Sequence, residues 1–148
     1  GGLTAPGVPW PPPFGCGASR GPGSTMSRDG TVLRADVHRP GGTGPWPVPL
    51  SRLPYGKQMP TALAILDPLA PARRGFMVVI QDTRGRSASE GWWEPWTYEE
   101  SDGYDTVRWA AALPDANGSV GMIGVSHFGD TQWTRSEHNF VHEGPSAC

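Results

Sequence analysis

The sequence predicts an α/β protein with a mostly parallel sheet and flanking helices. Residues 76–80 form a short, continuous apolar run, as expected of a strand that is covered on both faces. Residues 102–113 have the pattern of a helix with one apolar side, and residues 120–125 then form a second apolar strand. Strands that alternate with helices in this way are typical of parallel sheets.

The remaining elements precede these in the chain. Residues 31–37 alternate imperfectly between apolar and polar side chains and follow an Asp29-Gly30 turn, which favours an outer strand. Residues 48–52 predict another strand, although Pro49 has no N–H for a ladder. Residues 63–74 predict a short helix that Pro68 and Pro71 interrupt.

The helix of residues 102–113 also has recognisable boundaries. Ser101 or Asp102 can cap its N-terminus. The side chains expected to lie on the sheet are Tyr104, Val107 and Ala111. Asn117-Gly118 predicts the turn into the next strand.

Composition bounds the class of protein. A chain of 148 residues suits one domain, and 12 basic against 14 acidic residues give no electrostatic reason to expect nucleic acid or an anionic membrane as a partner. No apolar run approaches the roughly 18 residues of a membrane helix, and no secretion signal is visible, so a cytoplasmic, soluble protein is expected. Cys16 and Cys148 lie far apart and predict no disulfide framework, which leaves the redox compartment open.

Three segments differ in character. Residues 1–25 are rich in glycine and proline and are expected to be disordered, with a polyproline ligand as the less favoured alternative. Residues 26–133 hold the regular pattern of strands and helices. Residues 134–148 are polar, show no helical stripe, and are expected to form a divergent, disordered tail.

The segment Gly124-Val125-Ser126-His127-Phe128-Gly129 ends an apolar run with a serine between glycines. A strand, a sharp turn and then a helix is how a hydrolase exposes a nucleophilic hydroxyl. Here the spacing is G-x-S-x-x-G instead of the commoner G-x-S-x-G. Taken alone, such a segment is more often a plain turn.

Four further motifs precede that serine in the chain. They lie at residues 28–40, 51–57, 81–91 and 102–109, the third reading Gln-Asp-Thr-Arg-Gly-Arg-Ser-Ala-Ser-Glu-Gly. In this order, the set resembles the cocaine-esterase and X-Pro dipeptidyl-peptidase family of serine hydrolases, over about residues 27–133. The resemblance implies a partial α/β-hydrolase fold, truncated after the turn that carries the nucleophile, and a reaction that needs no metal or organic cofactor.

The resemblance also implies roles for three residues. Ser126 would be the nucleophile, while the backbone N–H of His127 and the hydroxyl of Tyr55 would form the oxyanion hole. The family's catalytic aspartate and histidine follow the serine in the chain, which places both beyond Cys148. A site without its base is expected to be inactive, since losing the triad as a unit costs about 10⁶ in turnover.

Tyr55, His127 and the nearby polar and aromatic residues also have alternative explanations. Tyr55 could be an ordinary turn tyrosine, and His127 could be the base, although adjacent side chains on a tight turn diverge. The polar residues after the strand of residues 76–80 could bind substrate, but pairing with each other or capping loops is favoured; they are Asp82, Arg84 and Arg86. Aromatic residues nearby could line an acyl pocket, but covering the sheet is favoured; they are Trp92, Trp93 and Trp96.

Other charged residues have weaker functional readings. Asp36 is most simply a surface charge, and Asp105 a helix-cap carboxylate. His138 and His142 have a spacing that can place two imidazoles on one zinc ion, with Glu143 and Cys148 as further ligands. A zinc site is nevertheless disfavoured, because no second ligand pair occurs elsewhere.

The function expected from the sequence is therefore hydrolysis of an ester, or of an amide such as an X-Pro dipeptide bond, through an acyl-serine intermediate. Partners would be a small-molecule ester or a short peptide, with esters slightly favoured. The alternatives are an inactive truncated relative that acts at most by binding, and a metal-binding module. The oligomeric state stays open, although the strand of residues 120–125 would present an uncovered edge that favours self-association.

Overall fold

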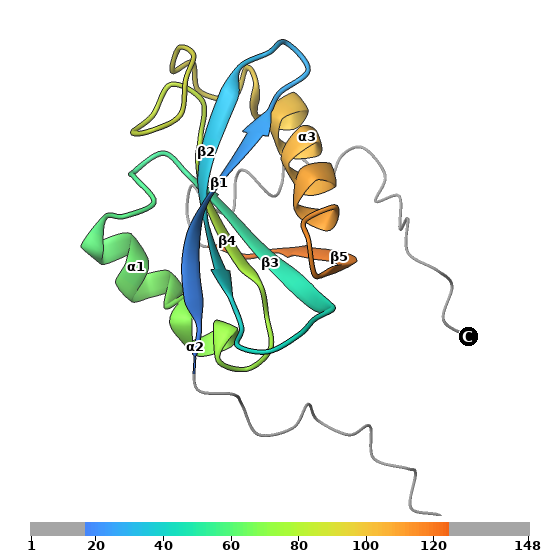
Figure 1. Cartoon of the computed structure of the whole chain (residues 1–148). Coiled ribbons are helices and arrows are strands. Elements are labelled where there is room, and N and C mark those ends of the chain that lie inside the picture. The colour runs from blue at the N-terminus through green and yellow to red at the C-terminus, as the bar shows by residue number, and fades with distance from the viewer. Residues whose placement is uncertain (1–16, 125–148) are drawn as a thin grey trace, which may run out of the picture.

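The computed structural model describes residues 17–124, which form an open mixed sheet with helices on both faces (Figure 1). The strand order is β1-β2-β4-β3-β5. The strands are β1 (Ser19–Met26), β2 (Val32–Arg39), β3 (Trp46–Leu53), β4 (Val78–Asp82) and β5 (Ala116–Met122). The helices are α1 (Pro60–Leu66), α2 (Leu69–Ala72) and α3 (Glu99–Ala111). The predicted α/β class is confirmed.

The sheet has an antiparallel and a parallel part. β1 pairs antiparallel with β2, and β2 pairs antiparallel with β4. β3 runs parallel to both of its neighbours, β4 and β5. The carboxyl ends of β3, β4 and β5 therefore lie along one edge of the sheet, whereas β2 ends at the opposite edge.

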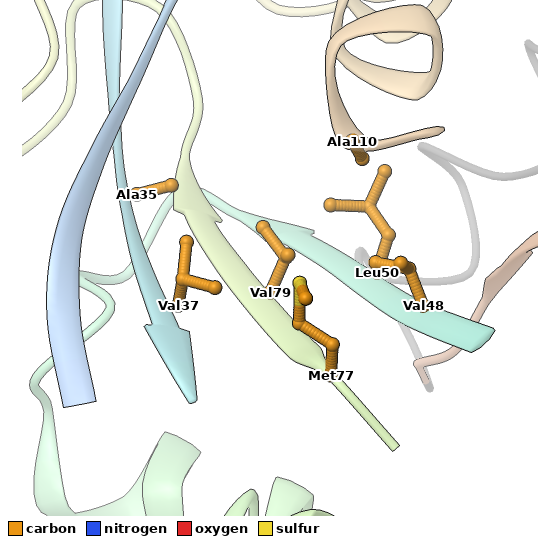
Figure 2. Packing of buried hydrophobic residues seen from close by; sticks show 7 residues of the cluster. All are labelled: Ala35, Val37, Val48, Leu50, Met77, Val79 and Ala110. Carbon is orange, nitrogen blue, oxygen red and sulfur yellow. The ribbon is translucent and has the colours of Figure 1, made fainter. Parts of the chain in front are cut away.

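β4 lies between two apolar clusters, which explains its continuous apolar sequence. One cluster joins the sheet to α3; Figure 2 shows its members Ala35, Val37, Val48, Leu50, Met77, Val79 and Ala110. The other lies against α1 and comprises Leu53, Ala62, Val78 and Ile80. Because alternate residues face opposite clusters, the strand is covered on both faces, as predicted.

The expectation that residues 1–25 are disordered is wrong for β1, which begins at Ser19. Pro22 is tolerated because β1 is an outer strand. A side chain at Gly23 would be crowded, because a Cβ there would lie 3.0 Å from the Trp109 ring of α3 and 3.0 Å from Val37. The missing side chain therefore makes room for a helix that lies far away in the sequence. Residues 1–16 lie outside the described residues.

The predicted strands of residues 31–37 and 48–52 are confirmed as β2 and β3, but β2 lies between β1 and β4 and is not the outer strand that was expected. A register shift accompanies the pairing of β3 with β5 between Trp46 and Val48. The interrupted helix is confirmed as α1 and α2, and Asp67 ends α1 in a left-handed conformation at φ 37°.

The predicted details of α3 and β5 need correction. α3 begins at Glu99, and neither Ser101 nor Asp102 makes a capping hydrogen bond. Its buried side is formed by Glu99, Asp102, Gly103, Thr106 and Ala110, because acidic residues of this helix turn inward to bind arginines. Of the side chains expected on the sheet, Val107 packs against the apolar cluster as predicted, whereas Tyr104 is exposed. Asn117-Gly118 is part of β5 and does not form the turn, which falls at residues 112–115.

Candidate active site

Three parallel strands end at the edge of the sheet where the sequence predicts a site. Leu53, the last residue of β3, pairs with Asp82, the last residue of β4. Met122 at the end of β5 pairs with Leu50, and the N–H of Ile123 donates to the carbonyl of Leu50 at 2.9 Å. The loops that follow all three strands therefore leave one edge. In open α/β sheets, ligands bind outside the carboxyl ends of the strands.

Tyr55 lies in the loop that leaves β3 at this edge. Its side chain is 47% exposed, and Gly56 follows it with φ at +98°, a conformation that favours glycine. The residue is therefore open to solvent at this edge. Ser126 and His127 follow β5 in the sequence and lie outside the described residues, so their roles stay predictions.

Asp82 is buried directly beside the Tyr55 loop. Its Oδ1 accepts a hydrogen bond from the N–H of Lys57 at 2.6 Å, and its Oδ2 accepts one from Lys57 Nζ at 3.0 Å and one from the N–H of Ala88 at 3.2 Å. The Asp82 carboxylate is thus paired with the Lys57 ammonium group and links the loop after β3 to the loop after β4. The preferred expectation that these polar residues hold loops is confirmed for Asp82, although its partner is Lys57, whose role the sequence analysis missed.

Arg86 and the tryptophans complete this edge. Arg86 Nε donates to the carbonyl of Pro54 at 3.1 Å, and its guanidinium stacks over the Trp93 ring at 4.7 Å. Trp92 is 82% exposed and Trp96 is 53% exposed. The expectation that Trp92 and Trp96 cover the sheet is therefore wrong.

Arg84 forms a second charged cluster, where the β1–β2 turn meets the N-terminal part of α3. Two of its nitrogens donate to Asp102 at 2.9 and 2.7 Å, and it also donates to Asp29 at 2.7 Å and Thr31 at 2.6 Å. Ser27 Oγ adds a hydrogen bond to Asp102 at 2.6 Å. Each of these hydrogen bonds joins Arg84 or Asp102 to another segment of the chain. The cluster therefore stabilises the fold, and a role of Arg84 in substrate binding is not supported.

The charges of this cluster shift the pKa values of its members. The bonds to Asp102 raise the pKa of Arg84, although burial opposes the shift. The Arg84 guanidinium, aided by the N–H of Thr31, holds the pKa of Asp29 well below its usual range. Both groups are consequently ionised at neutral pH.

Two carboxylates differ from their predicted surroundings. Asp36 is buried and pairs with Arg20 at 3.4 Å, so it is not a plain surface charge. Asp105 does not cap α3; it accepts hydrogen bonds from the N–H of Arg28 at 2.8 Å and from the Arg28 guanidinium at 3.0 Å. Burial raises the pKa of Asp105, but the bonds from Arg28 outweigh it and lower the pKa overall.

Arg52 in β3 is a buried cation that sequence reasoning missed. Its Nη1 donates to Glu99 Oε2 at 2.8 Å, and its Nε donates to Gln81 Oε1 at 2.9 Å. Thr106 Oγ1 donates to the same oxygen at 3.0 Å. The sequence signal for this ion pair was an arginine within a predicted apolar strand, because a charged side chain that is buried there requires a partner.

His38 is the one histidine among residues 17–124, and it lies at the opposite edge of the sheet. It pairs with Val78 at the start of β4, whereas the candidate site lies at the end of that strand. Burial lowers its pKa. In the described part of the chain, no group of three His, Cys, Asp or Glu residues could hold a metal, while His138, His142, Glu143 and Cys148 lie outside it. No described helix is long and apolar enough to cross a membrane.

The mixed sheet, its order and the loops gathered at one edge define an α/β-hydrolase fold. The family model for X-Pro dipeptidyl-peptidases of the S15 family matches residues 29–140. The chain belongs to this family, which confirms the resemblance found in the sequence.

Individual relatives agree with this assignment. Over 108 residues, 72% of the chain, it is 45% identical to cocaine esterase of Rhodococcus sp. (strain MB1 Bresler). A CocE/NonD family hydrolase from Staphylococcus aureus superposes with a TM-score of 0.70 and 29% identity, covering 79% of the chain. An α-amino acid ester hydrolase superposes with a TM-score of 0.66 and 26% identity, covering 88% of the chain.

The chain is short beside these proteins. It spans 19% of the length of the cocaine esterase, 24% of the Staphylococcus aureus hydrolase and 26% of the α-amino acid ester hydrolase.

Proposed function

We propose that this chain carries the nucleophile and the oxyanion donors of a serine hydrolase that cleaves ester or amide bonds through an acyl-Ser126 intermediate. One observation carries the proposal: the Tyr55 loop and the end of β5 leave the same edge of a parallel β4-β3-β5 unit. The family match extends beyond β5 and includes Ser126.

The proposed chemistry assigns a step to each of the three residues. The Ser126 hydroxyl attacks the carbonyl carbon and loses its proton to a base, and negative charge then develops on the former carbonyl oxygen. The N–H of His127 and the Tyr55 hydroxyl donate hydrogen bonds to that oxygen. Removing one such donor costs about 10²–10³ in turnover. The exposure of Tyr55 supports its role, because the phenol can reach a bound substrate.

The proposal places the general base and its orienting carboxylate outside these 148 residues. His38 is excluded as the base by its position at the far edge of the sheet. We do not assign the role of general base to His127, His138 or His142. We therefore propose that the chain on its own turns over poorly, although its sequence contains the proposed nucleophile and oxyanion donors.

The names of the relatives guide the choice of substrate. They include a cocaine esterase, an α-amino acid ester hydrolase and an aminopeptidase from a Thaumarchaeota archaeon. We propose a small-molecule ester or a short peptide as substrate. The ester is favoured because the relative at 45% identity is an esterase. The proposed reaction needs no metal or organic cofactor.

A fluorophosphonate probe tests the proposal with this chain, provided that imidazole is supplied as the missing base. The Ser126 oxygen forms a bond to phosphorus, fluoride leaves, and imidazole takes the proton. We expect labelling that rises with imidazole, disappears in Ser126→Ala, and slows by about 10²–10³ in Tyr55→Phe.

A second candidate, an inactive relative that only binds, has support in the absence of any histidine at this edge among residues 17–124. It predicts no labelling of Ser126 at any imidazole concentration, and that result would refute the hydrolase proposal.

A further inference from the structure

We infer that Arg86 and Asp82 are positioning residues that hold the Tyr55 phenol in place, an inference that rests on the function proposed above. The backbone around Tyr55 is bonded on both sides. The carbonyl of Pro54, just before it, accepts the hydrogen bond from Arg86, and the N–H of Lys57, two residues after it, donates to Asp82. Both bonds involve a charged group, and such bonds are stronger than neutral ones.

Asp82 is a rigid anchor. It is the last residue of β4, a strand whose residues are all buried, and its own side chain is fully buried. Both carboxylate oxygens are engaged, and its carbonyl accepts a further bond from Ser89 Oγ at 2.7 Å. The loop after β3 is thereby tied to the centre of the sheet.

Arg86 supplies the second anchor from the neighbouring loop. Its stacking on Trp93 restricts the guanidinium plane and keeps Nε directed at the Pro54 carbonyl. The two loops also approach each other at Gly56, where an added Cβ would lie 3.0 Å from Ser87 Oγ. The loop that bears Tyr55 is therefore held between the end of β4 and residues 86–87.

This restraint matters because an oxyanion donor must lie about 2.7–3.1 Å from the oxygen that it stabilises. Loops are more mobile than the elements they connect, and a misplacement of about 1 Å can cost about 10² in rate. Without the two anchors, the phenol would still be present but no longer held where charge develops.

The test measures backbone dynamics by NMR and the rate of fluorophosphonate labelling, both on the 148-residue chain. In Arg86→Ala, we expect the ¹⁵N order parameters of Tyr55 and Gly56 to fall from rigid values near about 0.85 toward about 0.6. Arg86 is exposed, so this variant is expected to fold. Arg73→Ala removes another exposed arginine and should change nothing at either amide. Asp82→Asn should loosen the same amides.

Fluorophosphonate labelling with imidazole then separates positioning from general stability. Arg86→Ala should slow labelling about tenfold to a hundredfold in the wild-type background. It should have no further effect in Tyr55→Phe, because a residue that acts through Tyr55 cannot act without the phenol. Arg86→Lys, which keeps a cationic donor, should restore part of the rate.

Two outcomes would overturn the inference: unchanged order parameters at Tyr55 and Gly56 in Arg86→Ala, or an equal loss of labelling in the Tyr55→Phe background. The proposed function fails in a different way. In that case, Ser126 is not labelled at any imidazole concentration, or Tyr55→Phe labels as fast as wild type, and the inference falls with it.

Discussion

Replacement of Asp102 by asparagine tests how far the Arg84 cluster stabilises the fold. Asp102 is buried and receives two bonds from Arg84 and one from Ser27. The substitution keeps the shape but removes the charge, and its amide would direct N–H groups at a guanidinium that can only donate. Breaking a buried ion pair costs about 3–5 kcal/mol. We expect about 3, because Asp29 still binds Arg84.

The assay is urea unfolding at pH 7, followed by tryptophan fluorescence and circular dichroism. With a denaturant slope of about 1.5 kcal/mol per M, a loss of about 3 kcal/mol lowers the midpoint by about 2 M. Asp105→Asn is the matched control. It removes an ion pair with Arg28, whose side chain is 59% exposed, and should cost less than about 1 kcal/mol.

A double variant completes this test. Arg84→Met combined with Asp102→Leu removes both charges and should recover much of the loss, since apolar residues of similar size often replace a buried ion pair without cost. If Asp102→Asn lowers the midpoint no more than Asp105→Asn does, the reasoning about this cluster is refuted.

Three further predictions concern stability. Gly85→Ala should cost about 1–3 kcal/mol in urea unfolding, because φ is +66° and a Cβ would meet the backbone of Trp92 and Trp93 in the same loop. Gly30→Ala, with open space around it, should cost less, and equal losses would contradict this. Leu50→Ala should cost about 2–5 kcal/mol by the same measurement and the exposed Leu69→Ala under about 1, and similar values would show that the core is misplaced. Because burial lowers the pKa of His38, its contribution is complete above the unfolded pKa of about 6.5 and is lost as pH falls below it, by at most about 1.4 kcal/mol per pH unit. A pH series of unfolding curves in which His38→Phe keeps the same slope between pH 7 and 5 would rule this out.

The sequence predicted those parts of the fold that depend on local pattern. β4 was found because both of its faces are apolar, and β2 because the Asp29-Gly30 turn precedes it. β1 was missed because its local composition is rich in glycine and proline, while its pairing with β2 and the packing of Trp109 near Gly23 involve residues elsewhere in the chain. A contact of that kind leaves no local signal.

The same reason limits the prediction of the candidate site. Tyr55 could be named only because its motif resembles those of a family, and the structure adds that this residue is exposed and lies at the edge where β3, β4 and β5 end. The partners of Asp82, Arg84 and Arg86 lie in other segments, so their bonds could not be derived from spacing. The roles of Ser126 and His127 remain predictions.

The position of β5 has a consequence for the order in which the molecule opens. Among the described strands, β5 pairs with β3 alone, and its residues are partly exposed, whereas β4 is buried between two neighbours. One ladder can therefore detach while the other three stay intact. The amide hydrogen of Ile123, which donates to Leu50 of β3, should exchange with deuterium sooner than those of Val79 and Ile80. The strand that leads to Ser126 would therefore fray before the centre of the sheet.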